Sequence, residues 1–128
     1  DISDKVLFKT GSFDLSDRAK TVLGKVALVL KNQPDIEFMV EGHTDNVAMN
    51  GNKELQDNWD LSVKRATTIV RMFQKQYGME PSKMVAAGRS EYQPIADNAT
   101  EDGRSQNRRT RIVILPQLDQ FFKLLERK

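Results

Sequence analysis

Arg65 stands where an apolar residue is expected. Apolar side chains recur at helical spacing through residues 58–77, among them Leu61, Ile69 and Phe73. Arg65 falls on this stripe, between Leu61 and Ile69. A guanidinium that faces a protein core needs a polar partner, because burying the charge unpaired is costly. The alternative is that the stem of Arg65 lies along the core while its head reaches solvent.

Asp45 is the acidic residue best placed to share a cleft with Arg65. It follows a predicted strand, in the segment GHTDN at residues 42–46. Ligands of open α/β sheets bind outside the carboxyl ends of the strands. The helix that carries Arg65 starts at this same edge, so the two side chains can face one cleft. The alternative is a structural salt bridge between them.

Periodicity and turn residues predict the elements that must position this pair. We expect strands at 6–8, 36–41, 84–87 and 109–115. We expect helices at 17–32 with Ser16 as cap, at 58–77 and at 118–127, and long loops at 42–56 and 88–106. The order β-α-β-α-β-β-α predicts an α+β fold, with the two long helices on one face of a mixed sheet and the last helix appended to it. The first three strands should be parallel where they are adjacent.

Composition narrows the classes of function. A chain of 128 residues is long enough for one domain with a buried core, and a net charge of +2 does not predict a nucleic-acid partner. The absence of cysteine excludes disulfides and thiol nucleophiles, and the single histidine, His43, excludes a His-rich metal site. No apolar run approaches the roughly 18 residues that span a bilayer. Since the sequence starts at Asp1, we expect an excised piece whose membrane association depends on segments absent from this chain.

Four segments in order resemble the OmpA C-terminal-like family, which contains the peptidoglycan-binding domains of OmpA, Pal-type lipoproteins and the MotB stator protein. The segments are GHTDN at 42–46, NWDLS at 58–62 followed by Arg65-Ala66, GRSEYQP at 88–94 and NRRTRI at 107–112. Together they cover roughly residues 5 to 115. We therefore expect a single OmpA-like domain over residues 1–128, with its core at about 5–115 and a helical tail at 117–128.

The resemblance implies a binding module rather than an enzyme, with no catalytic residue, cofactor or metal. Its ligand would be the diaminopimelate of the peptidoglycan stem peptide, held by Asp45 and Arg65. The free end of diaminopimelate carries an ammonium and a carboxylate. The carboxylate of Asp45 can accept hydrogen bonds from the ammonium, and the guanidinium of Arg65 can donate two parallel hydrogen bonds to the carboxylate. The resemblance also implies a pocket lining and a neighbouring wall, formed by Thr44, Asn58, Leu61, Thr10, Gly11, Ser12 and Phe13.

The resemblance implies a location as well. We expect the domain on the periplasmic side of the bacterial envelope, where it tethers a membrane-anchored parent protein to the wall. An outer-membrane parent is expected in preference to an inner-membrane stator. The long Asp45–Arg65 separation resembles MotB more than Pal, and the tail lies outside the family core. The sequence leaves homodimer formation open.

Two rival functions are weighed against this one. A wall-cleaving glycosidase could draw carboxylates from Asp45, Asp57 and Asp60, but no second site presents a positioned acid. A zinc amidase would need metal ligands that the chain lacks. A nucleic-acid binder could use the arginines of segment 104–111, but no aromatic residues interleave with them. We expect those arginines to be solvated or paired with acids.

Two single residues have both functional and ordinary interpretations. Trp59 could stack on a ligand, although anchoring the long loop against the core is the favoured prediction. His43 could be catalytic, but we expect a loop histidine that hydrogen-bonds locally or shapes the pocket. The apolar pairs of the tail could bind a partner helix, although we favour packing on the domain's own sheet.

Overall fold

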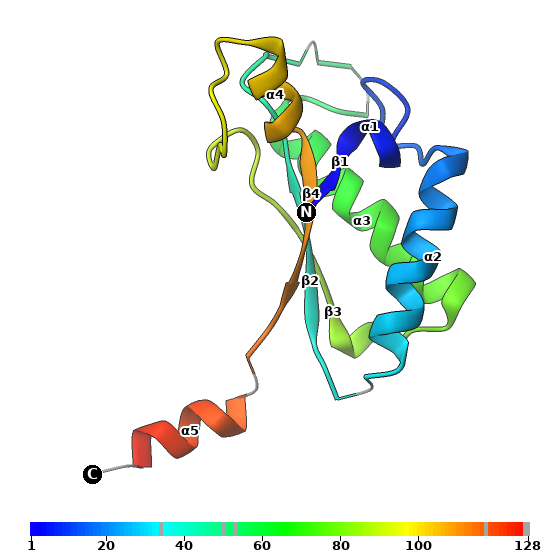
Figure 1. The fold of residues 1–128 in the computed structure, drawn as a ribbon, viewed down its shortest axis with the longest axis vertical. Helices are drawn as coiled ribbons and strands as arrows, with labels where there is room; N and C mark the ends of the chain where they lie inside the picture. The colour runs from blue at the N-terminus through cyan, green and yellow to red at the C-terminus, as the bar shows by residue number, and fades with distance from the viewer. Residues whose placement is uncertain (34, 50, 53, 117, 127–128) are drawn as a thin grey trace.

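The fold is a four-stranded mixed sheet with its two long helices on one face (Figure 1). The computed structural model describes residues 1–33, 35–49, 51–52, 54–116 and 118–126. The strands are β1 (Ile2–Ser3), β2 (Phe38–His43), β3 (Met84–Gly88) and β4 (Arg109–Ile114). The helices are α1 (Asp4–Leu7), α2 (Asp17–Lys31), α3 (Asn58–Tyr77), the 3₁₀ turn η1 (Pro81–Lys83), α4 (Glu101–Asn107) and α5 (Leu118–Glu126).

The spatial order of the strands is β1-β4-β2-β3. β2 and β3 are parallel, as the α3 crossover between them requires, and β4 lies antiparallel to both β1 and β2. The predicted mixed sheet and its two covering helices are confirmed. None of the helices that the structure describes is long and apolar enough to cross a bilayer.

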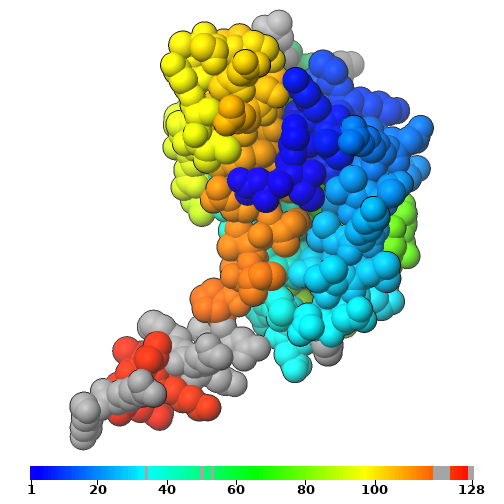
Figure 2. Space-filling model, in the orientation of Figure 1, coloured from blue at the N-terminus to red at the C-terminus, as the bar shows by residue number. Residues whose placement is uncertain are grey.

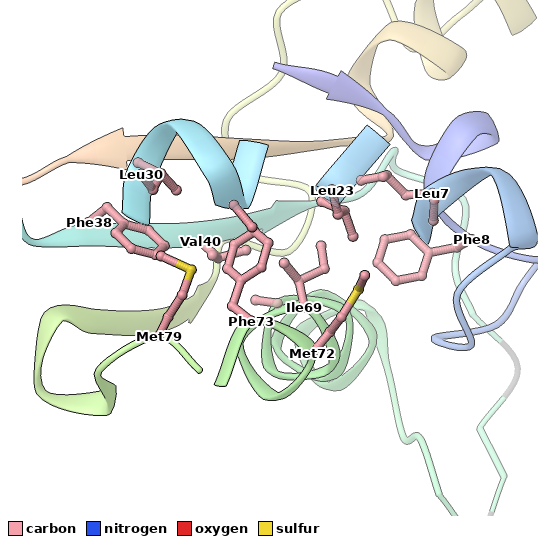
Figure 3. Packing of buried hydrophobic residues seen from close by; sticks show 13 residues of the cluster. Leu7, Phe8, Leu23, Leu30, Phe38, Val40, Ile69, Met72, Phe73 and Met79 are labelled. Atoms are coloured by element: carbon pink, nitrogen blue, oxygen red, sulfur yellow. The ribbon is translucent and has the colours of Figure 1, made fainter. Parts of the chain in front are cut away.

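The hydrophobic core lies between the sheet and the α2–α3 layer. Phe38 and Val40 of β2 are almost wholly buried, and the Phe38 ring meets Phe73 of α3 edge-on, with ring centroids 6.0 Å apart. Figure 3 shows Phe38 at one end of this layer and Phe8 at the other. The cleft described below therefore opens at the Phe8 end of a continuous apolar core.

The ends of the long helices follow the sequence signals. Ser16 caps α2 by accepting a hydrogen bond from the backbone N–H of Ala19 at 3.1 Å. α3 begins after Asp57, whose carboxylate accepts from the N–H of Asp60 at 3.0 Å. α3 ends at Gly78, which has a φ of 62° and supplies the left-handed cap. Both helices therefore match the predicted ranges to within one residue.

The predicted strand at 6–8 is wrong. Residues 4–7 form the helical turn α1, and the first strand is β1, which pairs with β4. A run of three apolar residues is too short to distinguish a strand from a helix. The tertiary contacts decide, because the backbone N–H of Asp4 bonds to the Arg108 carbonyl at 3.0 Å and Phe8 bridges to Leu15.

Two further segments differ from expectation. The predicted loop 88–106 contains most of α4, which is polar, only seven residues long and without apolar periodicity, so it gave no helical signal. α5 forms as predicted, but it projects away from the sheet instead of packing on it (Figures 1 and 2). Leu124 and Leu125 are accordingly 62% and 65% exposed. Residues 117, 127 and 128 of the predicted tail lie outside the described residues.

Gly42 sets how closely α3 approaches β2. A Cβ at Gly42 would collide with the backbone carbonyl of Ser62 in α3. We therefore predict that Gly42→Ala lowers the free energy of unfolding by about 1–3 kcal/mol, the usual cost of overpacking a well-filled interior. Urea unfolding followed by circular dichroism measures the change. Val85→Thr, at a side chain 44% exposed on the neighbouring strand, is the control and should stay within about 0.5 kcal/mol. Equal stability of Gly42→Ala and wild type would contradict this packing account.

Candidate functional site

A cleft of about 580 Å³ opens where β2 ends and α3 begins. It brings together most of the predicted site residues: Thr10, Gly11, Thr44, Asp45, Asn58, Leu61 and Arg65. Ser12 and Phe13 are not among the residues that line it, although Ser12 contacts Arg65 through its backbone carbonyl. The carboxyl end of a sheet strand and one face of a neighbouring helix therefore form the cleft, as the Asp45 and Arg65 positions predicted.

Arg65 is buried at the base of the cleft. It is only 4% exposed, so the alternative of a solvated head group is wrong. Its Nε donates to the Ser12 carbonyl at 2.8 Å, and its Nη1 donates to the Asp4 carboxylate at 2.8 Å. The guanidinium carbon lies 4.9 Å from the centre of the Phe8 ring. These three contacts restrain the guanidinium, and within the described part of the chain they leave further N–H donors uncommitted.

The pKa values of both Arg65 and Asp4 are shifted in the direction that desolvation favours, against the attraction between the two charges. Burial raises the pKa of Asp4, and the attraction of Arg65 and Arg108 does not overcome that effect. Burial likewise lowers the pKa of Arg65, against the attraction of Asp4. Both shifts disfavour the charged forms, so desolvation exceeds the mutual attraction. Titratable groups in a cleft whose pKa values are shifted by burial and by a charged partner are candidates for functional residues.

Asp45 is held by a different set of contacts. Its Oδ1 accepts from the backbone N–H of Val47 at 3.0 Å, and its Oδ2 accepts from Nη1 of Arg108 at 2.6 Å. The backbone around it is held by Asn58, whose side-chain amide donates to the Val47 carbonyl at 3.0 Å. The Thr44 hydroxyl donates to the Asp45 carbonyl at 2.8 Å. The carboxylate is thus fixed in direction, and Asp45 as a whole is 7% exposed.

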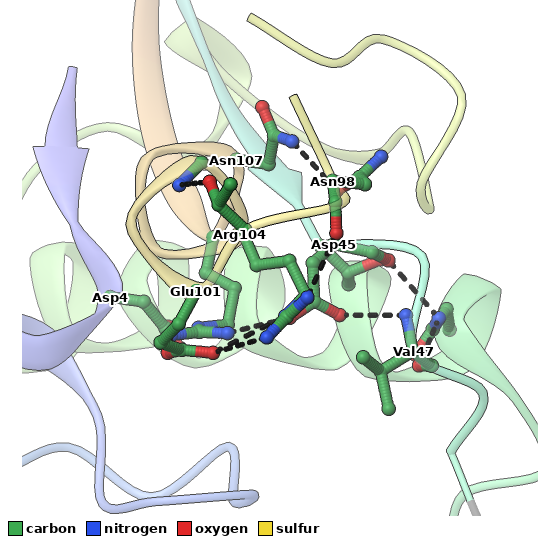
Figure 4. A network of polar contacts seen from close by, with 12 residues as sticks. Asp4, Asp45, Val47, Asn98, Glu101, Arg104 and Asn107 are labelled. Carbon is green, nitrogen blue, oxygen red and sulfur yellow. Dashed lines mark hydrogen bonds and ion pairs between the residues drawn. The ribbon is translucent and has the colours of Figure 1, made fainter. Parts of the chain in front are cut away.

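Arg108 links Asp45 to Glu101, the first residue of α4. Figure 4 shows Asp45, Glu101 and Arg104 in one network of polar contacts. The Nη2 of Arg108 donates to Glu101 at 2.7 Å, and Arg104 reaches the other oxygen of Glu101 at 3.2 Å. Burial works against the charged form of Arg108, yet its hydrogen bonds to Glu101 and Asp45 raise its pKa. Arg108 is therefore well satisfied electrostatically, in contrast to Arg65.

No hydrogen bond or ion pair joins Asp45 to Arg65, both of which lie within the described chain. The alternative of a structural salt bridge between them is wrong. Each instead has its own partner of opposite charge, Arg108 and Asp4 respectively. Two opposite charges thus face one cleft without neutralising each other, which suits a ligand with a positive and a negative group close together.

Comparison with known proteins assigns this chain to a family. The family model described as "OmpA family" matches residues 7–108, which include every residue of the cleft except Asp4 and Lys5. The chain belongs to the OmpA family.

The chain is similar to two known proteins and to one solved structure, among others. "Motility protein B" of Bacillus subtilis is 33% identical over 90% of this chain and 44% of its own length. "Outer-membrane lipoprotein YfiB" of Pseudomonas aeruginosa is 34% identical over 88% of this chain and 64% of its own. The cell wall anchor of the T6SS from Pseudomonas aeruginosa superposes with a TM-score of 0.80 at 29% identity, over 91% of this chain and 79% of that one. The chain thus spans less than two thirds of both full-length relatives.

Five charged residues of this cleft were absent from the predicted site: Asp4, Lys5, Glu101, Arg104 and Arg108. Arg104 and Arg108 were assigned only to a basic cluster, whose expected pairing with acidic side chains the structure shows. Asp4 gave no signal, because it lies far from Arg65 in sequence and just before the segment 6–8, which was predicted to be a strand. The role of Asp4 as the partner of Arg65 could be recognised only in the three-dimensional structure.

The two remaining single-residue expectations have different outcomes. His43 is the last residue of β2 rather than a loop residue, and its Nε2 pairs with the buried carboxylate of Glu41. Trp59 does not anchor the loop against the core; its ring is 48% exposed and contacts the ring of Tyr92. Within the described ranges, no group of three or more His, Asp or Glu side chains is placed to hold a metal ion.

The raised pKa of Asp4 predicts how an Asp4→Asn variant responds to pH. The folded protein holds the Asp4 proton to a higher pH than the unfolded chain does. The stability that Asp4 contributes is therefore full below its ordinary pKa of 3.8 and is lost as the pH rises through the raised value. Asparagine does not titrate, so the variant escapes this loss. We expect the free energy of unfolding of Asp4→Asn, relative to wild type, to be larger at about pH 7 than at about pH 4.

Urea unfolding of both proteins at the two pH values measures this difference. Titrations common to wild type and variant cancel in the comparison, so the change with pH reports on Asp4 itself. A relative stability that falls between the lower and the higher pH would show that Arg65 repays the burial of Asp4, contrary to our account.

Proposed function

We propose that this domain binds bacterial peptidoglycan non-covalently through the diaminopimelate of the stem peptide. One observation carries the proposal: a buried guanidinium and a fixed carboxylate face the same cleft without pairing with each other. The free end of diaminopimelate presents an ammonium and a carboxylate on one carbon, and its side-chain methylenes suit the apolar surface of Leu61 and Phe8 in the same cleft.

The ligand would complete contacts that the free protein makes internally. The ligand's ammonium takes the place of the Arg108 guanidinium at Asp45, while Arg108 keeps its second partner, Glu101. The ligand's carboxylate accepts from the Arg65 donors that Ser12 and Asp4 leave uncommitted. Asp45 alone would accept many amines and Arg65 alone many acids, so the pair selects an amino-acid head group.

The remaining predicted residues would shape the site around this pair. Thr44 and Asn58 hold the backbone that carries Asp45, and Leu61 lies one helical turn before Arg65 on the cleft side of α3. Thr10 and Gly11 line the opposite side of the cleft, and Ser12 orients Arg65. Phe13 would act from outside the lining, as part of the same wall.

The names of the relatives support a wall-tethering role in the cell envelope. They include a motility protein, an outer-membrane lipoprotein and a cell wall anchor. We infer that this domain works on the periplasmic side of the envelope and ties a longer, membrane-anchored protein to the wall. An outer-membrane anchor is favoured over an inner-membrane one, and the anchor would belong to other parts of the parent protein.

The proposed role is binding without cleavage. Of the three carboxylates that a glycosidase could use, only Asp45 lines the cleft. Asp57 caps α3 through the N–H of Asp60, and Asp60 accepts from the N–H of Gln56 at 2.9 Å. The pair of facing acids that glycoside hydrolysis requires is therefore not assembled from these residues.

Co-sedimentation with purified sacculi tests the proposed function. We predict that Asp45→Asn and Arg65→Gln each weaken binding at least about 20-fold, because removing one member of a buried charge contact costs about 2–5 kcal/mol. Arg71→Gln, on the exposed face of the same helix, is the matched control and should bind like wild type. Circular dichroism checks the fold of each variant. Wild-type binding by both cleft variants would refute the site, and release of soluble muropeptides would refute binding without cleavage.

A further inference from the structure

A second potential binding surface lies outside the cleft, where two aromatic rings meet at the protein surface. Trp59 is the second residue of α3, and Tyr92 follows the end of β3. Their ring centroids lie 5.4 Å apart with the ring planes tilted by 37°. The two residues are nevertheless 48% and 65% exposed, and neither lines the cleft. They are in contact with each other, yet a large part of each residue remains exposed to water.

The Tyr92 side of this pair is held by a strained turn. Ser90 has a φ of 53°, the left-handed region that a residue with a side chain seldom adopts. It persists because its carbonyl accepts from the N–H of Thr44 at 2.9 Å and its own N–H donates to the Ser62 hydroxyl at 3.1 Å. Ser90 is 2% exposed, so the turn is locked against the body of the domain. Strain held in place by surrounding contacts is common at functional positions.

The chemistry of the surface favours a saccharide. Each ring combines an apolar face with a polar edge, the indole N–H of Trp59 and the phenol hydroxyl of Tyr92. A pyranose has the matching form, with C–H groups on its faces and hydroxyls at its rim. Two rings are too small for a stable protein interface, which buries about 800 Å² on each partner. The adjacent acids Asp60 and Glu91 disfavour an anionic membrane surface.

This surface is structurally continuous with the proposed peptide cleft. Trp59 directly follows Asn58, which lines the cleft, and the Ser90 turn is bonded to Thr44, which also lines it. A stem peptide bound in the cleft is covalently linked to the sugars of the wall. A sugar site next to the cleft would then add affinity through a second, tethered contact.

We propose that Trp59 and Tyr92 form a saccharide platform that stacks on a pyranose ring of the peptidoglycan glycan. The biological assignment rests on the proposed peptidoglycan function, whereas saccharide binding by the rings does not require the Asp45–Arg65 site. The two sites can be tested separately for that reason.

Trp59 is the only tryptophan in the chain, so intrinsic fluorescence reports on the platform directly. The probe is the peptide-free tetramer of β-1,4-linked N-acetylglucosamine. We expect a saturable change in tryptophan fluorescence with wild type. Tyr92→Ala should weaken binding about tenfold, whereas Tyr92→Phe should bind within about twofold of wild type, because it keeps the stacking ring. Val29→Ala, at an exposed side chain on α2, is the distant control.

A crossed comparison separates the two proposals. Asp45→Asn should keep tetramer binding and lose binding of an isolated diaminopimelate stem peptide, and Tyr92→Ala should show the reverse. No saturable binding of the tetramer to wild type by fluorescence or calorimetry would overturn the saccharide platform. Equal tetramer affinities of wild type and Tyr92→Ala would overturn it as well. Failure of the stem peptide to distinguish Asp45→Asn from wild type would instead count against the cleft.

Discussion

The site depends on the burial of the Arg65 guanidinium. Charge in a protein interior is tolerated only when geometry and hydrogen bonds offset its desolvation. Burial raises the pKa of Asp4 and lowers the pKa of Arg65, the directions expected where this offset is incomplete. The fold retains the pair because packing of the surrounding hydrophobic core stabilises the protein by more than the part of the desolvation cost that the pair leaves unmet. A guanidinium restrained by Ser12, Asp4 and Phe8 loses little further freedom when an anion arrives, so its remaining donors are prepared for a ligand.

The rest of the architecture places a carboxylate opposite this guanidinium. The missing side chain at Gly42 allows α3 to pack tightly on β2, which brings the start of the helix beside the end of the strand. Asn58 then fixes the loop after Asp45, and Arg108 holds the carboxylate from the α4 side. In the free protein each ligand-facing charge is matched by an internal charge. At Asp45, binding would exchange the Arg108 guanidinium for the ligand's ammonium, and at Arg65 the ligand's carboxylate would use donors that Ser12 and Asp4 leave uncommitted.

The sequence predicted the long-range plan better than the local details of the site. Helical periodicity and caps located α2 and α3, and the position of Arg65 on an apolar stripe identified a buried charge. The partner of Arg65 could not be predicted, because Asp4 reaches it through a helical turn that three apolar residues do not specify. α4 escaped detection because a polar seven-residue helix has no periodic signal. The ion pairs that Asp4 and Glu101 make in the cleft depend on these two elements, so they could be seen only in three dimensions.

The central claim is that Asp45 and Arg65 read the ammonium and the carboxylate of one amino-acid head group. Calorimetry with two stem peptides that differ only in diaminopimelate or lysine tests it most directly, because lysine keeps the side-chain ammonium and lacks the adjacent carboxylate. Leaving the buried Arg65 without that partner costs about 2 kcal/mol or more, so the lysine peptide should bind at least about 20–30-fold more weakly. Equal affinities for the two peptides would show that Arg65 does not read the carboxylate, and would contradict the account.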